Sequence, residues 1–298
     1  MTASNIKGPK KCEYETAGVI VGSMASLIDV KDTTISDSGC SYIFSDRTPV
    51  VARGIHFTSG YESPYIRVMG SQLEVSESVF SAALQIDPSV KGRAINCDLC
   101  TKLNVTGSQF NDLQAYQGGA VFVKNSANGT LQNNSFTGNL ARQGGAIYLQ
   151  NSDLKLFEND FQSNRAESSS FDDKLLRNVL VVVTDISTGG GVFFTCVNPE
   201  DSLLKYAQTS ANITACFDGI SSSSELDDLS QNCEGKENVT KELDLVIGDT
   251  NAGCRLQVDG NTFVNNTAET RDSFGNRTSD QLGNNIFFTN KQLQDKKG

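Results

Sequence analysis

Short segments of the chain alternate apolar and polar residues with a period of two. Leu103 and Val105 flank a polar residue, and Val121 and Val123 flank Phe122. Successive side chains of a β-strand point to opposite faces, so this period predicts strands. Gly and Asn separate the segments, and the 3.6-residue period of a helical repeat is not found. The pattern therefore predicts an all-β protein made of many short strands.

The strands belong to a repeat of about 25 residues. The segment 103–125 is echoed by 130–151, with Phe110 and Phe136 separated by 26 positions. Further partial copies lie at 28–35, 73–80, 91–96, 154–164 and 256–266. The segments 52–57, 188–194 and 283–288 fit the second half of the repeat, which contains Gly-Gly-Ala. Such short strands bury their apolar face only by stacking, with parallel strands about 4.8 Å apart. We expect a single-stranded right-handed parallel β-helix, a solenoid of about six turns.

Each recurring residue of the repeat has an expected structural role. The phenylalanines should stack inside the coil, and burying each contributes about 1.5–3 kcal/mol. Ile35 takes the same position in an earlier copy. The expected stack contains Phe80, Phe110, Phe136, Phe161 and Phe263. Asparagines at 139, 164 and 266 should satisfy backbone groups at a corner and tolerate a left-handed conformation there. Glycines at 118, 119, 144 and 145 should supply positive φ and close approach between turns.

The combination of two motifs resembles a known repeat. Gly-Gly-Ala-[Ile/Val] occurs at 118–121 and 144–147, and Phe-x-x-Asn at 136–139, 161–164 and 263–266. This pairing resembles the repeats of chlamydial polymorphic outer-membrane proteins, which also occur in many protist secreted or surface proteins. The resemblance implies the pectin-lyase-like β-helix fold over about half of the chain. It implies nothing about an activity.

The repeat divides the chain into four expected parts. These are an N-terminal cap (1–25), the β-helix turns (26–195), a Cys-rich insertion (196–254), and a final turn with a tail (255–298). Phe161 and Gly189 are 28 residues apart, against 8 for Phe110 and Gly118. Residues 165–187 are therefore expected to leave the solenoid, with a strand-like apolar run at 179–183.

The eight cysteines are all expected to form disulfides. Cys12 and Cys40 should tie the cap to the first turn. Cys97 and Cys100 form a single C-x-x-C, which favours a local disulfide over zinc binding or thiol redox chemistry. The four cysteines of the insertion should pair among themselves in one of three ways; they are Cys196, Cys216, Cys233 and Cys254.

One outward position of the second-half strand carries aromatic residues in several copies. If exposed, such a stripe would contact a partner subunit or sugar rings. The alternative is that an insertion of the chain folds over it. The residues assigned to this position are His56, Asn96, Phe122, Tyr148, Phe193 and Phe287.

Composition narrows the functional classes. The formal net charge is -10 and there is one His, which argues against nucleic-acid binding and a multi-His metal site. No apolar run reaches the ~20 residues of a spanning helix, so this chain is not expected to cross a membrane. No cofactor is expected. With the cysteines, seven N-x-[ST] sequons favour a secretory setting, outside the cell or at its surface; they are Asn104, Asn128, Asn133, Asn212, Asn238, Asn265 and Asn276.

Two functions from different classes fit these features. The first is a non-catalytic extracellular structural or adhesive glycoprotein, a subunit or segment of a larger surface or filament assembly. It would associate with itself or with other surface proteins through its terminal strands. The alternative is a carbohydrate-active β-helix that binds or cleaves polysaccharide, which needs two opposed carboxylates about 5–9.5 Å apart. The acidic pairs at 172–173 and 227–228 both fall in predicted excursions. No catalytic motif is found, and no catalytic residue is assigned.

Overall fold

The computed structural model describes residues 5–9, 11–12, 18–59, 63–81, 90–167, 190–195, 243–249, 254–269 and 286–289. The described residues form strands and no helix, and the strands stack into three long faces. Face A contains β1 (Asn5–Lys7), β4 (Thr34–Ser36), β7 (His56–Thr58), β10 (Val79–Ser81), β13 (Gln109–Asn111), β16 (Ser135–Thr137), β20 (Asp160–Gln162) and the second half of β24 (Cys254–Val264).

Faces B and C complete each turn. Face B contains β2 (Gly18–Ser23), β5 (Ser41–Asp46), β8 (Ile66–Met69), β11 (Ile95–Asp98), β14 (Val121–Lys124), β18 (Ile147–Gln150), β22 (Val192–Thr195) and β26 (Ile286–Thr289). Face C contains β3 (Ile28–Lys31), β6 (Val50–Arg53), β9 (Gln72–Ser76), β12 (Lys102–Thr106), β15 (Gly129–Gln132), β19 (Asp153–Phe157) and the first half of β24. A short extra sheet contains β17 (Leu140–Ala141), β21 (Arg165–Glu167) and β25 (Thr267–Glu269). The chain runs from face B to C to A in each turn.

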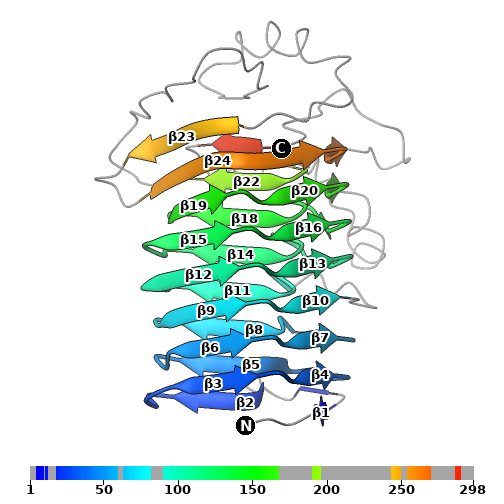
Figure 1. The fold of residues 1–298 in the computed structure, drawn as a ribbon, viewed down its shortest axis with the longest axis vertical. Coiled ribbons are helices and arrows are strands. Elements are labelled where there is room, and N and C mark those ends of the chain that lie inside the picture. The colour runs from blue at the N-terminus through cyan, green and yellow to red at the C-terminus, as the bar shows by residue number, and fades with distance from the viewer. Residues whose placement is uncertain are drawn as a thin grey trace, which may run out of the picture.

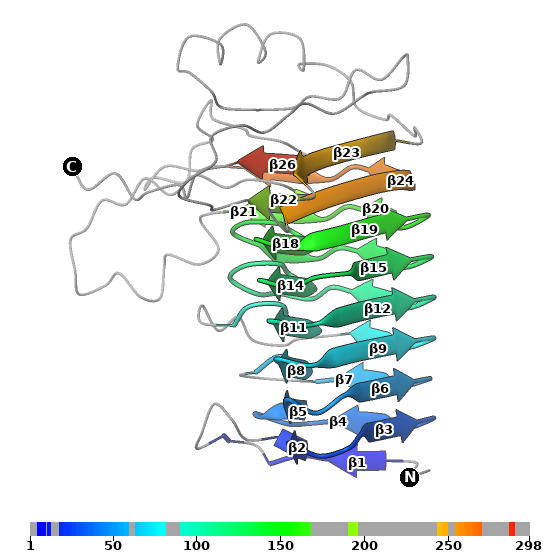
Figure 2. The same cartoon turned by 90° about the vertical axis from the view of Figure 1, so that its left-hand side faces the viewer.

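The coil is right-handed. In Figure 1 the strands of faces C and A run left to right at the front, those of face B return behind them, and the chain climbs from its N-terminal end. Figure 2 shows the same stack from the side. Neighbouring strands within these faces are parallel; the exception is β23 (Leu243–Asp249), which pairs antiparallel with β24. The expected parallel β-helix of about six turns is confirmed, and β1 and β26 add partial turns at its ends.

Phenylalanines stack along the inside of face A. Ring centroids are 4.8 Å apart for Phe80 and Phe110, 4.6 Å for Phe110 and Phe136, and 4.8 Å for Phe136 and Phe161. Phe263 continues the stack at 4.7 Å. The predicted stack is therefore confirmed, and Phe57 extends it toward Ile35.

The buried asparagines form a hydrogen-bonded row next to this stack. The Nδ2 of Asn139 donates to Oδ1 of Asn164 (2.8 Å), and Asn164 donates likewise to Asn266 (2.9 Å). Each of these oxygens also accepts the backbone N–H of the preceding asparagine. The expected backbone role is confirmed, but the left-handed conformation falls one position earlier, at Gly138, Ser163 and Asn265. A second row, which the sequence analysis missed, joins Asn134, Asn159 and Asn261 at the corner between faces C and A.

The Gly-Gly pairs act as expected. Gly118 has φ +62, and a Cβ on it would overlap the carbonyl oxygen of Val121. A Cβ on Gly119 would overlap the carbonyl oxygen of Gly145 in the next turn. The first glycine therefore allows the bend, and the second lets two turns approach closely.

Two boundaries differ from the sequence interpretation. β2 pairs with β5, so the solenoid begins before residue 26 and inside the range assigned to the cap. The prediction that 52–57 forms the second half of the repeat is wrong, because Ala52 lies on face C and Phe57 on face A. The second-half strands of the early turns are β5 and β8, which lack a Gly-Gly signal. Residues 165–167 of the expected excursion stay in the solenoid, because they form β21 between β17 and β25. Residues 168–187, including 179–183, and residues 196–242 of the insertion lie outside the described residues.

Candidate functional site

The outward column of face B contains the aromatic residues in the expected register. Phe122 lies beside Tyr148, Tyr148 beside Phe193, and Phe193 beside Phe287. Toward the N-terminal end the column continues through Asn96, Arg67 and Phe44. The assignment of His56 to this column is wrong. His56 belongs to β7 on face A, where it pairs with Thr34 and Val79 and is exposed.

The aromatic rings of this column are covered. Phe122, Tyr148 and Phe193 are only 3%, 6% and 2% exposed, and their ring centroids are 5.3 Å and 4.8 Å apart. Lys91 lies over the Phe122 ring with its Nζ 5.3 Å from the centroid, and Gln117 hydrogen-bonds to Tyr148. Both residues precede a strand of face B, so the solenoid itself contributes to the cover. These three rings do not form an open aromatic surface, and the side chain of Phe287 lies outside the described residues.

Burial changes the proton affinity of two groups at this cover. It raises the pKa of Tyr148 to about 12, with Tyr116 adding to the shift and the hydrogen bond with Gln117 opposing it. Burial also lowers the pKa of Lys91. Lys124 lowers that pKa further, and Asp98 opposes the shift. Lys91 and Gln117 therefore cover the rings of Phe122 and Tyr148, and these rings are not open to a ligand.

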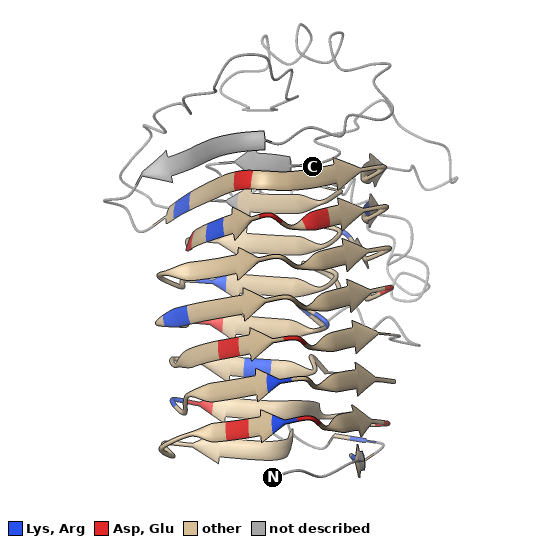
Figure 3. Ribbon diagram, in the orientation of Figure 1, with Lys and Arg blue, Asp and Glu red and all other residues tan. Residues whose placement is uncertain are grey.

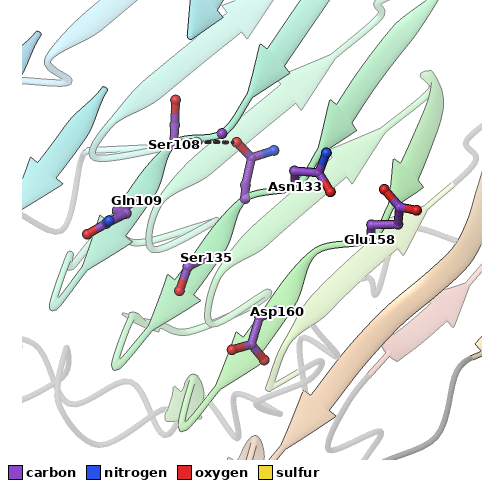
Figure 4. Close-up of a pocket in the computed structure, with 8 residues that line it drawn as sticks. Ser108, Gln109, Asn133, Ser135, Glu158 and Asp160 are labelled. Atoms are coloured by element: carbon purple, nitrogen blue, oxygen red, sulfur yellow. Dashed lines mark hydrogen bonds between the residues drawn. The ribbon is translucent and has the colours of Figure 1, made fainter. Parts of the chain in front are cut away.

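A hollow of about 340 Å³ lies where face C turns into face A (Figure 4). Equivalent residues of successive turns line it, at 107–109, 133–135, and at Glu158 and Asp160. Asn134 is buried beneath it and accepts the Ser108 N–H at 2.9 Å. The sequence analysis missed this hollow, which is lined by Glu158 and Asp160, two exposed residues on either side of the buried Asn159.

The hollow offers hydrogen bonds to a polar ligand. The amide and hydroxyl groups of Gln109, Asn133 and Ser135 lie around it, and the Glu158 carboxylate accepts from Gln132 at 3.4 Å. In Figure 4 the side chains of Glu158 and Asp160 point away from each other. Glycoside hydrolysis needs two carboxylates that face a bond from opposite sides, which is not the arrangement drawn there.

Charges on the outer strands are paired locally. Arg53 contacts Glu74 at 3.1 Å, and Arg255 contacts Asp153 at 3.1 Å. Figure 3 shows Lys and Arg interspersed with Asp and Glu along the strands facing the viewer. Such pairs leave no strongly charged face among the strands that Figure 3 presents.

The cysteines of the solenoid form the expected local disulfides. Cys12 is bonded to Cys40, and Cys97 to Cys100. Cys97 and Cys100 are buried in the core. Cys254 is disulfide-bonded, and Cys196, Cys216 and Cys233 lie outside the described residues.

The sequons within the described residues lie on the outside. Asn128, Asn133 and Asn265 are exposed with positive φ, and Asn104 is half-buried on face C. Asn133 also lines the hollow, so a glycan on Asn133 would occupy it. The sequons at 212, 238 and 276 lie outside the described residues.

Metal binding and membrane spanning can also be considered for the described residues. In the described ranges, no group of three or more His, Cys, Asp and Glu side chains could hold a metal ion. Nor does this part of the chain contain a helix with the length and apolar character needed to span a bilayer.

Comparison of the chain with protein-family models, with curated proteins and with solved structures found no match.

Proposed function

We propose that this protein is a non-catalytic structural or adhesive β-helix glycoprotein of the cell exterior, a subunit or segment of a larger surface or filament assembly. The observation that carries the proposal is the outward placement of sequon asparagines on a disulfide-linked solenoid. Asn128, Asn133 and Asn265 all project from corners. Corners are the positions where an attached glycan disturbs no strand pairing.

The interior supports a mechanical role. Its phenylalanine stack and asparagine rows run from turn to turn and use the polar groups of the buried side chains within the coil. Because the recurring residues of the repeat are buried in the stack, only the outer faces and the ends of the solenoid are accessible to partners. The resemblance of the Gly-Gly-Ala and Phe-x-x-Asn motifs to repeats of surface proteins favours the same location.

The first test is glycan occupancy. The chain would be secreted from eukaryotic cells, and its intact mass measured before and after peptide-N-glycosidase treatment. We expect a mass loss on treatment, and a loss of one glycan in the Asn128→Gln variant. Asn151→Gln is the matched control, because Asn151 also has positive φ at a corner but is not in a sequon. Secreted protein with every sequon unmodified would contradict the proposal.

A second candidate function rests on the hollow at Glu158 and Asp160. Its amides, hydroxyls and carboxylates are groups that bind sugar hydroxyls, so a carbohydrate-binding solenoid is the alternative. A screen of oligosaccharides by calorimetry would test it, with Asp160→Asn and Glu158→Gln expected to abolish any heat of binding. Gln162→Ala on the same strand serves as the control. Binding that both carboxylate variants retain would place the ligand elsewhere.

A further inference from the structure

Strand edges and apolar side chains lie at the N-terminal end of the described solenoid. Among the described strands, β2 and β3 are the last of faces B and C at this end. Beside these edges Val21, Met24 and Leu27 are 54%, 68% and 49% exposed. Among the described side chains, Leu99 is the other exposed large apolar residue. Edge strands with apolar neighbours are templates for further strand pairing.

The backbone of β3 shows which groups face the open edge. The Ile28 N–H donates to Pro49, and the Asp32 N–H donates to Arg53, both toward the next turn. The N–H and C=O groups of successive residues of a parallel strand point to alternate sides, so those of the even-numbered residues bond to the next turn. The N–H and C=O groups of Asp29 and Lys31 therefore point to the open edge.

The side chains of β3 are self-complementary. Ile28 and Val30 are buried, whereas Asp29 and Lys31 are exposed and form an ion pair at 3.1 Å. In an antiparallel pair of two β3 strands with a two-fold axis at Val30, Asp29 lies opposite Lys31 of the second copy, and Lys31 opposite Asp29. These are the residues whose backbone groups face the edge, so the same register satisfies both charges and hydrogen bonds. A shift by one residue would set the inward Ile28 and Val30 opposite outward residues of the second copy, so the two cores would no longer lie on the same side of the shared sheet.

The charge around this end also suits a second copy. The chain has a formal net charge of -10, so two copies repel each other in general. The described residues up to position 37 carry Lys7, Lys11 and Lys31 against Asp29, Asp32 and Asp37, which is three of each sign. The described residues of this end therefore add no net like charge to the repulsion between two copies.

The other end of face C shows this kind of closure within one chain. There β23 pairs antiparallel with β24 at the edge of the parallel stack. The fold thus accommodates an antiparallel strand on a solenoid edge.

We propose that the N-terminal edge pairs with the same edge of a second copy, forming a head-to-head dimer through antiparallel β3 strands. Val21, Met24 and Leu27 lie beside the edge and become covered in the contact. The inference rests on the proposed function in one respect, since it names the partner through which the solenoid assembles.

Charge reversal gives a direct test on the full 298-residue chain. Sedimentation velocity over a concentration series should show a dimer of twice the 32.1 kDa monomer mass. Asp29→Lys sets Lys opposite Lys at two symmetric positions, so the dissociation constant should rise about tenfold or more. Lys31→Asp should do the same with like negative charges. The double variant Asp29→Lys/Lys31→Asp restores opposite charges and should recover the dimer.

Controls separate dimerisation from folding. Arg255→Glu breaks an outward ion pair of the same kind, with Asp153, at the other end of face C and should leave the dimer intact. Thermal unfolding of each variant checks that the solenoid is folded. A monomeric wild-type chain at every concentration would overturn the proposal, as would a dimer insensitive to the single reversals or a double variant that fails to recover. None of these outcomes depends on glycan occupancy, so the dimer and the proposed function can fail separately.

Discussion

At the scale of single residues, the buried asparagines connect successive turns by hydrogen-bonding corner backbone groups that strand pairing leaves without partners. Asn164 accepts from both the N–H and the Nδ2 of Asn139, and it donates to the Phe136 carbonyl at 2.8 Å. The corner carbonyl and N–H would otherwise be buried without partners. Ser108 accepts the Ser78 N–H in the earlier turns of the second row. Its hydroxyl donates to the Thr106 carbonyl of its own turn at 3.0 Å, whereas Asn134 also donates to the Val105 carbonyl of an earlier turn.

Replacing one member of the row should therefore be costly. Asn164→Ala leaves the Asn139 N–H and the Phe136 carbonyl without their partner, and each unsatisfied buried group costs about 1–3 kcal/mol. We expect a loss of about 3 kcal/mol or more in the free energy of unfolding, measured by denaturant titration. Gln162→Ala, an exposed change two residues away, should have little effect. Equal destabilisation by the two variants would show that the row is not a major source of stability.

The raised pKa of Tyr148 predicts that the free energy of unfolding falls as the pH rises above 10. Its pKa is about 12 in the folded chain, above the ordinary value of 10.0. Between those values the unfolded chain has lost this proton and the folded chain has kept it, so stability falls as pH rises. Its contribution is fully present below pH 10, and the slope is about 1.4 kcal/mol per pH unit.

The measurement compares wild type with Tyr148→Phe. Unfolding midpoints would be recorded in matched buffers from neutral pH to pH 12, and the variant should lose stability less steeply above pH 10. Identical slopes would mean that the phenol ionises in both states alike.

At the scale of elements, close approach between turns depends on glycine. Gly119 does not have positive φ, yet a Cβ there would overlap the Gly145 carbonyl oxygen. Gly119→Ala therefore tests space alone. We expect a loss of about 2 kcal/mol or more, because stacked backbone cannot shift as a flexible side chain can.

Gly107 provides the matched comparison. It has φ +57, and the nearest atom to an added Cβ is the Glu77 Cγ at 4.0 Å. Asparagine already occupies the equivalent corner at position 133, so Gly107→Asn should change the stability by less than about 1 kcal/mol. If Gly107→Asn destabilises the chain more than Gly119→Ala, the positive φ that glycine permits matters more to stability than the close approach of backbones that it permits.

The elements also show what the sequence could predict. The 26-residue spacing of Phe110 and Phe136 was enough to predict the stack, because a fixed interval repeats one side-chain direction. The sequence Gly-Ile-His-Phe around His56 imitates a Gly-Gly-Ala strand, yet Phe57 stacks on Phe80. The spacing alone did not show whether the segment around His56 lies on face A or on face B. The cover over Phe122 depends on how the segment around Lys91 lies across its own coil, and periodicity contains no information about that path.

At the scale of the whole molecule, each turn contacts only its neighbours, so stability should vary along the axis. The turns from β12 to β20 have strands on both sides and contain the stacked Phe110, Phe136 and Phe161. The turn containing β2 and β3 has partners on one side only among the described strands. A linear array of this kind opens more easily at an end than in its centre.

Hydrogen exchange followed by mass spectrometry should resolve this gradient. We expect peptides covering 102–111 and 129–137 to exchange most slowly, and peptides covering 18–31 to exchange faster. Head-to-head dimerisation would slow exchange at β3 alone, because only that strand gains hydrogen-bond partners there. Comparing wild type with Asp29→Lys at one protein concentration separates the two effects. The central turns should be unchanged, and β3 should be more protected in wild type. Uniform protection along the axis would mean that the solenoid unfolds as one cooperative unit, and the end would then be no weaker than the centre.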